Sequence, residues 1–182
     1  MTTKILAISG SLRQSSLNSM LLRAVARLAP PGIEVSLFPG LGELPLFNPD
    51  IESPEPPPVR RLREAILATD ALVIASPEYA HGVTGVMKNA LDWMVGNETF
   101  VDRPVALLNA SPRATHAQAA LRETVVTMSA RVVEEACITV PVLGSGLDEE
   151  AIVAHREIGP ALAAALETLA ADVRPAGSRA VD

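Results

Sequence analysis

Five short apolar runs recur along the chain, each six or seven residues long and separated from the next by a longer segment. Runs that are apolar at nearly every position are typical of parallel strands buried on both faces. Such strands need helices on both sides of the sheet, so this feature limits the possible folds more than any other. The runs stand at residues 4–9, 33–38, 71–76, 104–110 and 137–143.

The segments between and after these runs have the apolar spacing of amphipathic helices. Five strands alternating with five helices predict an α/β fold, a three-layer sandwich around a five-stranded parallel sheet. The simplest doubly wound arrangement of five such strands has the order 2-1-3-4-5. The apolar helix positions are Leu21, Val25 and Leu28; Leu62 and Ile66; Val86, Ala90, Leu91 and Met94; Leu121 and Val125; and Ile158, Leu162, Leu166 and Leu169.

The length of 182 residues fits one domain, which we predict over residues 1–172 with a flexible tail at 173–182. One long connection, residues 39–59, interrupts the alternation. Its prolines at positions 45, 49, 54, 56, 57 and 58 disfavour a regular helix and a central strand, so we predict a loop. Loops of this length are usually functional or mobile, and a surface wrap without a ligand role is the alternative.

The formal net charge of −6 argues against a general nucleic-acid-binding protein, because neutralising phosphates needs a clustered excess of Lys and Arg. No apolar run reaches the roughly 18 residues of a membrane span, and the first run is too short for a signal peptide, so we expect a cytoplasmic protein without a membrane partner. The single cysteine, Cys137, is predicted to be a buried strand residue. The three histidines stand on different predicted elements, which disfavours a metal site.

The loop after the first strand, "SGSLRQSSLNS", has the composition of a phosphate site. Ligands of open parallel sheets bind beyond the carboxyl ends of the strands, where the strand order reverses. This loop lies there, and it leads into a helix expected to begin near Ser16 to Asn18, whose free N–H groups favour an anion. Short hydrogen-bonding side chains and the guanidinium of Arg13 add donors, the short ones being Ser9, Ser11, Ser15, Ser16 and Asn18. Neither a dinucleotide fingerprint nor a P-loop is present, so a terminal monophosphate fits best; a plain helix cap is the alternative.

Two further loops are expected at the same edge of the sheet. The second, which begins at Pro77, holds Glu78, the only tyrosine (Tyr79) and two glycines that permit close approach to a flat ligand. The third follows the fourth strand and carries Ser111, Arg113 and His116. These side chains could contact the polar rim of a ligand or a second phosphate, although an ordinary helix start capped by Thr115 explains them nearly as well.

The segments "GSLRQSSLN" and "SPEYAHGVTGVMKNALDW" together resemble the NADPH-dependent FMN reductase family, flavodoxin-like oxidoreductases that include quinone, azo-dye and chromate reductases. The resemblance runs from about Lys4 to Leu169 and takes in "LPLFNPD", residues 44–50, which implies that the proline-rich connection is a wall of the active site. It also implies a flavodoxin-like fold with the sheet order given above.

The resemblance implies which residues bind the cofactor FMN. Ser9, Ser11, Arg13, Ser16 and Asn18 match the phosphate ligands, and Pro77, Glu78 and Tyr79 match the residues that line the flavin ring. Ala80 stands where the family pattern has asparagine, which is expected to weaken flavin affinity, and "SPRATHAQ" replaces a glycine-rich turn. The full predicted set is Ser9, Ser11, Leu12, Arg13, Ser16, Asn18, Pro77, Glu78, Tyr79, Ala80, His81, Gly82, Ser111 and Arg113.

The implied reaction passes hydride from NADPH or NADH through FMN to a quinone, azo compound, free flavin or similar small-molecule acceptor, without a dedicated catalytic acid or base. We expect Arg113 to pair with the 2′-phosphate of NADPH. A homodimer or homotetramer is expected through the helix after the second loop, because Leu91, Trp93 and Met94 suggest a wide apolar surface. A flavodoxin-type electron carrier and a non-catalytic regulator on the same fold are the alternatives.

Overall fold

The computed structural model, which describes residues 2–173, has one parallel sheet of five strands at its centre. The strand order is β2-β1-β3-β6-β7, and each neighbouring pair is parallel. Numbered among the sheet strands alone, this is the order 2-1-3-4-5, so the predicted topology is confirmed. The strands are β1 (Thr3–Ser9), β2 (Ile33–Leu37), β3 (Ala71–Ala75), β6 (Pro104–Leu108) and β7 (Arg131–Val132).

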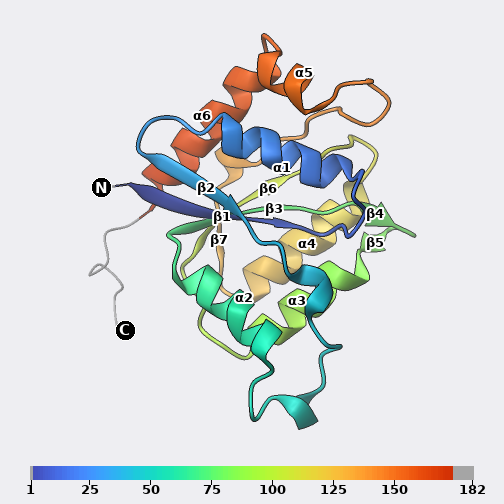
Figure 1. Cartoon of the computed structure of the whole chain (residues 1–182), viewed down its shortest axis with the longest axis vertical. Helices are drawn as coiled ribbons and strands as arrows, with labels where there is room; N and C mark the ends of the chain where they lie inside the picture. The colour runs from blue at the N-terminus through green and yellow to red at the C-terminus, as the bar shows by residue number, and fades with distance from the viewer. Residues whose placement is uncertain (1, 174–182) are drawn as a thin grey trace.

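Helices cover both faces of this sheet and make the predicted three layers (Figure 1). One face carries α1, α5 and α6, and the other carries α2, α3 and α4. Each helix of the expected five is present, and α5 is an additional short helix. The bounds are α1 (Leu17–Arg27), α2 (Pro57–Leu67), α3 (Gly85–Val95), α4 (Thr115–Thr127), α5 (Glu149–Ala154) and α6 (Ile158–Ala171).

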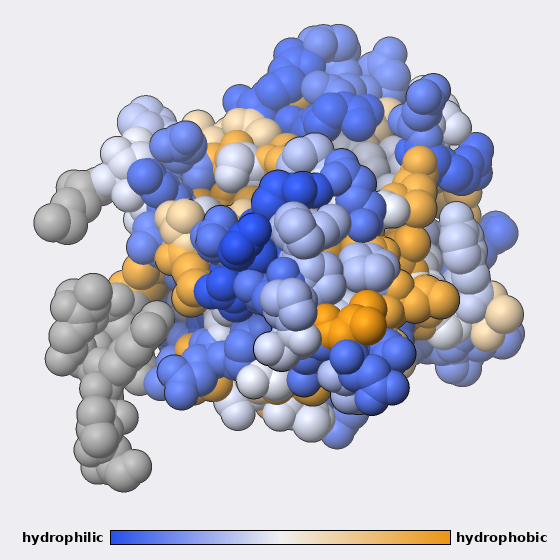
Figure 2. Space-filling model, turned by 60° about the horizontal axis from the view of Figure 1, so that its bottom comes forward, coloured by the Kyte–Doolittle hydropathy of each residue, from blue (hydrophilic) through white to orange (hydrophobic). Residues whose placement is uncertain are grey.

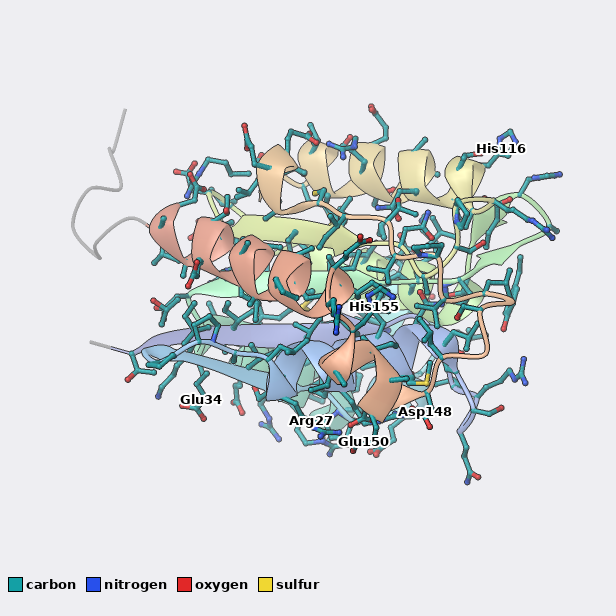
Figure 3. All side chains as sticks on the ribbon, turned by 90° about the horizontal axis from the view of Figure 1, so that it is seen from above. Arg27, Glu34, His116, Asp148, Glu150 and His155 are labelled. Carbon is teal, nitrogen blue, oxygen red and sulfur yellow. The ribbon has the colours of Figure 1, made fainter. Side chains whose placement is uncertain are left out.

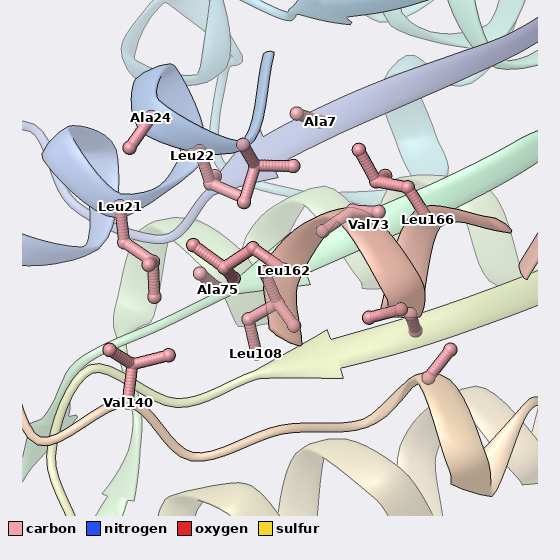
Figure 4. Packing of buried hydrophobic residues seen from close by; sticks show 14 of the residues in the cluster. Ala7, Leu21, Leu22, Ala24, Val73, Ala75, Leu108, Val140, Leu162 and Leu166 are labelled. Atoms are coloured by element: carbon pink, nitrogen blue, oxygen red, sulfur yellow. The ribbon is translucent and has the colours of Figure 1, made fainter. Parts of the chain in front are cut away.

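The central strands β1, β3 and β6 are apolar along most of their length because each contributes to two cores. Along β1, Ile5 and Ala7 pack toward α1 and α6, while Leu6 and Ile8 pack toward α2 and α3. Successive side chains of a strand point to opposite faces, so a strand covered on both sides has few positions for a polar residue. Figure 4 shows the first core, in which strand residues face those of α1 and α6: Ala7, Val73, Ala75 and Leu108 against Leu21, Leu22, Leu162 and Leu166.

The fifth strand is shorter and earlier than predicted. It comprises only Arg131–Val132, and a 3-10 turn, η3 (Glu134–Ala136), follows it. The predicted run 137–143 is not a regular strand, although it stays beside β6 through one bridge between Asn109 and Thr139. The proline at position 141 has no N–H to extend the ladder. Cys137 is accordingly a partly buried residue next to a 3-10 turn rather than a buried strand residue.

The proline-rich connection ends earlier than predicted, because α2 begins at Pro57. Proline is tolerated in the first turn of a helix, where its missing N–H would have no intrahelical acceptor. The remaining loop holds two 3-10 turns, η1 (Leu41–Glu43) and η2 (Pro49–Ile51). It is fixed to α3, since the Pro45 carbonyl accepts hydrogen bonds from Trp93 Nε1 at 2.8 Å and Asn89 Nδ2 at 2.9 Å.

Ion pairs fix the short helix α5 against α1. Arg23 Nε lies 2.7 Å from Glu149, and Arg27 binds Glu150 through both of its terminal nitrogens. Figure 3 shows Arg27 and Glu150 pointing toward each other across the two helices. The segment that precedes α5 is thereby held at the carboxyl-terminal edge of the sheet.

No helix within residues 2–173 is both long enough and apolar enough to cross a bilayer. The tail predicted at 173–182 lies, apart from its first residue, outside the described residues.

Candidate functional site

A cavity of about 300 Å³ lies at the carboxyl ends of β1, β3 and β6, where the three polar loops meet. This is the switch point of the sheet, the place at which the strand order predicts a ligand. The cavity thus joins the three loops that the sequence singled out. Its lining residues are Ser11, Arg13, Ser15, Ser16, Leu17, Asn18, Pro77, Glu78, Tyr79, Asn109, Ala110, Ser111, Arg113, Ala114 and Leu143.

The first loop wraps the N-terminus of α1, as predicted. Ser16 is the N-cap, and its Oγ accepts the N–H of Ser19 at 3.2 Å. Arg13 is exposed, and its Nη2 donates to Ser15 Oγ, two residues later in the loop, at 3.1 Å. The N–H groups of the first turn have no acceptor within the helix, and the helix dipole favours an anion there. The mouth of α1 therefore presents open N–H groups to the cavity with a guanidinium beside them.

Asn18 supplies the strongest sign that this mouth takes a ligand. Its side chain is only 6 % exposed, and its Oδ1 has no hydrogen-bond partner among residues 2–173. Buried polar atoms are nearly always paired, because leaving one unpaired costs about 1–3 kcal/mol. Asn18 lines the cavity, so a hydrogen-bond donor of a bound molecule can pair with Oδ1. If the side-chain amide is flipped, its nitrogen can instead donate to an acceptor oxygen of that molecule.

The first and second loops touch directly through Gly10. A Cβ built on Gly10 would lie 2.3 Å from Ser76 Oγ and 2.7 Å from Ser76 Cβ, so only glycine fits. The Gly10 N–H donates to the Ala75 carbonyl at 2.8 Å, and the Gly10 carbonyl accepts from Thr84 Oγ1 at 2.7 Å. These contacts set the distance between the first loop and the second loop, which form two walls of the cavity.

The second loop is a tight antiparallel hairpin of β4 (Glu78–Tyr79) and β5 (Gly82–Val83). Its two turn residues, Ala80 and His81, have φ of 50° and 59°. Asparagine or glycine adopts this left-handed region more readily than alanine, so an asparagine at this position would also serve the turn itself. Tyr79 is 57 % exposed at the cavity mouth, with its ring free to stack on a ligand.

Glu78 caps α4 from the hairpin, a role that the alternative interpretation of the third loop gave to Thr115. The N-cap position of α4 is Ala114, whose methyl group cannot accept a hydrogen bond from the first turn of the helix. Glu78 Oε2 instead accepts the Ala117 N–H at 2.9 Å, and Glu78 Oε1 binds His81 Nδ1 at 3.0 Å. The mouth of α4 is thus already occupied by a carboxylate, which leaves α1 as the open helix N-terminus of this edge.

The hydrogen bond from Ala117 holds the pKa of the Glu78 carboxyl below its ordinary value, and the bond from His81 acts in the same direction. A carboxyl whose pKa is lowered by folding stabilises the fold above its unfolded pKa of about 4.3, and this contribution is lost as the pH falls through the folded pKa.

We therefore expect Glu78→Gln to lower the free energy of unfolding most at neutral pH, with the difference from wild type shrinking below about pH 4. Urea denaturation across this pH range measures it, with the exposed Glu52→Gln as control. A difference that stays constant with pH would show that the charge of Glu78 does not contribute.

The third loop brings Ser111 and Arg113 to the cavity as predicted, and it adds Asn109, which the sequence analysis missed. Asn109 is 4 % exposed and organises the loop, since its Oδ1 accepts the Ser111 N–H at 3.0 Å and its Nδ2 donates to the Ala114 carbonyl at 3.2 Å. A polar residue at the carboxyl end of a buried strand was the available signal. Leu143, also missed, reaches the cavity from the segment after β7.

The predicted site residues divide into those that line the cavity and those that do not. Ser9 lies behind the wall, with its Oγ 2.7 Å from Ser19 Oγ. Leu12 lines a neighbouring cavity of about 490 Å³, which shares Ser11, Arg13 and Tyr79 with the first. The hairpin tip, Ala80 to Gly82, lines neither cavity.

The proline-rich loop, expected to be a wall of the site, lines neither cavity within this chain. Its turn η1 instead backs the first loop, because a Cβ on Gly42 would lie 3.0 Å from Leu12 Cδ2.

The wide apolar surface expected on α3 is absent, because Leu91, Trp93 and Met94 are 3 %, 5 % and 1 % exposed. All three belong to the core between α3 and the sheet. Trp93 packs edge-on against Phe47, with the two ring centroids 5.1 Å apart. Loop residues that fold over α3, and not a partner subunit, cover this face.

His155, the histidine remote from the cavity, caps α6: its Nδ1 accepts the N–H groups of Glu157 and Ile158. Within residues 2–173 there is no group of three or more His, Cys, Asp or Glu side chains placed to hold a metal ion.

Comparison with known proteins places this chain in a family. The model of the family described as NADPH-dependent FMN reductase matches residues 3–142. An NAD(P)H-dependent FMN reductase of Pseudomonas aeruginosa is 43 % identical over 129 residues, which are 68 % of this chain and 69 % of that protein. A 2-hydroxy-1,4-benzoquinone reductase of a Burkholderia species is 38 % identical over 114 residues. That match covers 61 % of this chain and 62 % of the relative, less than two thirds of its length.

A solved structure extends the similarity to most of the fold. The flavoenzyme NAD(P)H:(acceptor) oxidoreductase FerB of Paracoccus denitrificans superposes with a TM-score of 0.78 at 26 % identity. The superposition covers 94 % of this chain and 97 % of that one. Because the family model covers most of the residues, including all three loops of the cavity, this chain belongs to the NADPH-dependent FMN reductase family of flavodoxin-like oxidoreductases.

Proposed function

We propose that this protein is an NAD(P)H-dependent FMN oxidoreductase that passes electrons to a quinone, azo compound, free flavin or similar small-molecule acceptor. One observation carries the proposal: the open N-terminus of α1, with the unpaired Asn18 Oδ1, shares a single cavity with Tyr79 and Arg113. One end of this cavity suits a phosphate group and the other has an aromatic wall. Together they fit a ligand that has both a phosphate group and a flat ring.

The residues present fit FMN. Its phosphate would lie among Ser11, Arg13 and the first turn of α1, where donors are abundant and no carboxylate lines the cavity on that side. Its ring would lie between the hairpin and the third loop. When bound, FMN supplies the redox chemistry, accepting hydride from NAD(P)H and giving electrons to the acceptor.

The protein's own part is to bind and orient. Arg13 would pair with the charge of the phosphate. The unpaired Oδ1 of Asn18 would accept a hydrogen bond from the ligand or, with the amide flipped, the Asn18 side chain would donate one to it. Pro77 and Tyr79 would support the ring by backbone and stacking contacts. The cavity lining holds one carboxylate, Glu78, which is committed to α4, so no residue stands ready as a general acid or base.

The two alternatives remain distinguishable by experiment. A flavodoxin-type carrier would bind FMN and react poorly with NAD(P)H, whereas a regulator would bind no flavin. Against the carrier, the chain has one tyrosine and one tryptophan, and Trp93 is buried beneath the proline-rich loop and cannot sandwich a ring. Against the regulator, the phosphate site retains its donors and an unpaired polar atom.

Steady-state oxidation of NADPH by the FMN-loaded protein, followed at 340 nm with a benzoquinone as acceptor, tests the proposal. We expect turnover without any added reductase. Flavin binding without NADPH or NADH oxidation would instead favour the carrier.

We also propose a homodimer or homotetramer in the cytoplasm, where NADPH is available. Leu46 supports the assembly: it is 83 % exposed although hydrogen bonds to α3 fix the residues on both sides of it. Figure 2 shows the face that comes forward when the bottom of Figure 1 is turned toward the viewer, on which hydrophobic groups lie among hydrophilic ones. Light scattering that gives the mass of a single chain at micromolar concentration would refute the assembly.

A further inference from the structure

A second cavity, of about 490 Å³, adjoins the cavity in which we place the flavin. The two cavities share Ser11, Arg13 and Tyr79, so a molecule in the second would lie against the same tyrosine as a molecule in the first. The function proposed above gives the second cavity no occupant. Its other lining residues are Gly10, Leu12, Thr84, Gly85 and Val86.

Two large apolar side chains are exposed at this second cavity. Leu12 of the first loop is 60 % exposed, and Tyr79 of the hairpin is 57 % exposed. Exposed apolar groups that gather in a hollow are typical of a binding site, because a ligand that covers them removes apolar surface from water. The end of the cavity at α3 is open, since a Cβ built on Gly85 would meet no other part of the described chain within 4 Å. The cavity therefore suits a flat, apolar molecule.

The turn η1 fixes the position of Leu12 from behind. A Cβ built on Gly42 would lie 3.0 Å from Leu12 Cδ2 and 3.3 Å from Leu12 Cδ1, so only glycine leaves the leucine methyl groups where they are. The turn cannot easily give way, because Leu41 and Leu44 on either side of Gly42 are buried in the core that α2 and α3 cover. A methyl group at Gly42 would therefore displace Leu12.

The continuity of the two cavities indicates which molecule the second one takes. An electron acceptor must lie next to the flavin, because reacting groups have to approach to contact distance. The second cavity meets this condition, since three of its lining residues also line the first. The acceptor is thus the occupant that the position of this cavity favours.

We propose that the second cavity holds the electron acceptor, a flat apolar ring such as that of a quinone, and that Leu12, positioned by Gly42, sets how tightly the acceptor binds. This inference rests on the proposed function, since it assumes that the acceptor receives electrons from FMN in the first cavity. Leu12 contacts the acceptor, whereas Gly42 acts only through the position of Leu12. The proline-rich loop thereby influences acceptor binding although it lines neither cavity.

The first test compares kcat/KM for two acceptors, naphthoquinone and ferricyanide, with NADPH as the donor. Ferricyanide is strongly hydrated and has no apolar ring, so the ratio of the two values isolates the contact with Leu12. We expect Leu12→Ala to lower this ratio roughly fivefold through a higher KM for naphthoquinone, and Leu12→Met to retain it. Gly42→Ala should change the ratio by at least roughly twofold, because its methyl group displaces Leu12.

Two further variants separate an effect through Leu12 from a general effect of the turn. Gly40→Ala adds a methyl group to the same turn, but against Phe38, and should leave the ratio at its wild-type value. In Leu12→Ala combined with Gly42→Ala, the added methyl group has no leucine to displace, so the ratio should equal that of Leu12→Ala alone. If Gly42→Ala changes the ratio equally with and without Leu12, the turn does not act through this residue and the inference is wrong.

The second test measures binding without turnover. Calorimetric titration of naphthoquinone into the oxidised, FMN-loaded protein, without NADPH, should show roughly fivefold weaker binding to Leu12→Ala than to wild type. Equal binding overturns the proposal. An equal loss of FMN affinity in Leu12→Ala would make Leu12 a flavin contact, and a change of mass by light scattering would make it a subunit contact; either result also overturns the proposal. Failure of wild type to bind FMN or to oxidise NADPH would defeat the proposed function, whereas naphthoquinone can be titrated into the protein in either case.

Discussion

Replacing Gly10 with alanine is expected to destabilise the protein by about 1–3 kcal/mol and to weaken FMN binding by at least roughly tenfold. The new Cβ would lie 2.7 Å from Ser76 Cβ and 3.1 Å from Ser76 Cα, so rotation of the serine hydroxyl cannot relieve the contact. The first and second loops must then separate. The phosphate site and the wall that holds Tyr79 would no longer stand at the spacing a single ligand needs.

A compensating variant makes this prediction specific. Gly10→Ala combined with Ser76→Gly removes the two closest atoms and should recover most of the lost stability and affinity. Thermal denaturation and flavin fluorescence quenching measure the two quantities on the same samples. Wild-type affinity in Gly10→Ala alone would mean that the contact between these loops does not position the ligand.

Replacing Asn18 with leucine is expected to change stability and binding in opposite directions. The substitution removes a buried oxygen without a partner, so the free energy of unfolding should stay the same or rise by about 1 kcal/mol. FMN affinity should fall by at least roughly tenfold, because a hydrogen bond to a charged group contributes about 1.5–3 kcal/mol.

Ser16→Ala is the matched control at the same helix end. It removes the cap that accepts the Ser19 N–H, so it should lower the free energy of unfolding by about 0.5–2 kcal/mol. If Asn18→Leu destabilises the protein as Ser16→Ala does, Asn18 has a structural role and its oxygen is not kept for a ligand.

The fold was predictable from the sequence because the central strands carry their own signal. All five residues of β3 and of β6 are buried, and such runs cannot face water. The edge strand β7 gave no comparable signal: it has two residues, one of them Arg131, and only β6 pairs with it. The later run at 137–143 was more apolar and was mistaken for the strand itself.

The parts of the candidate site that depend on contacts within one loop were predictable from the sequence. The parts that depend on contacts between residues far apart in the sequence were not. Ser16 and Asn18 could be assigned to the mouth of α1 because caps and helix starts are local patterns. Glu78 caps α4, which begins at Thr115, 37 residues later along the chain. No local sequence pattern encodes a contact between residues so far apart. The same holds for Leu143, which lines the cavity from the segment after β7 and whose N–H donates to the Ala110 carbonyl at 3.2 Å.

The most direct test of the central claim is a titration of FMN with the purified protein, followed by quenching of flavin fluorescence, in wild type, Arg13→Ala and Arg156→Ala. Arg156 is an exposed arginine outside the cavity lining and controls for net charge. We expect saturable one-to-one binding that Arg13→Ala weakens by roughly tenfold or more while Arg156→Ala leaves it unchanged. Absence of saturable binding in wild type, or equal affinity in all three proteins, would contradict a flavin phosphate at the N-terminus of α1.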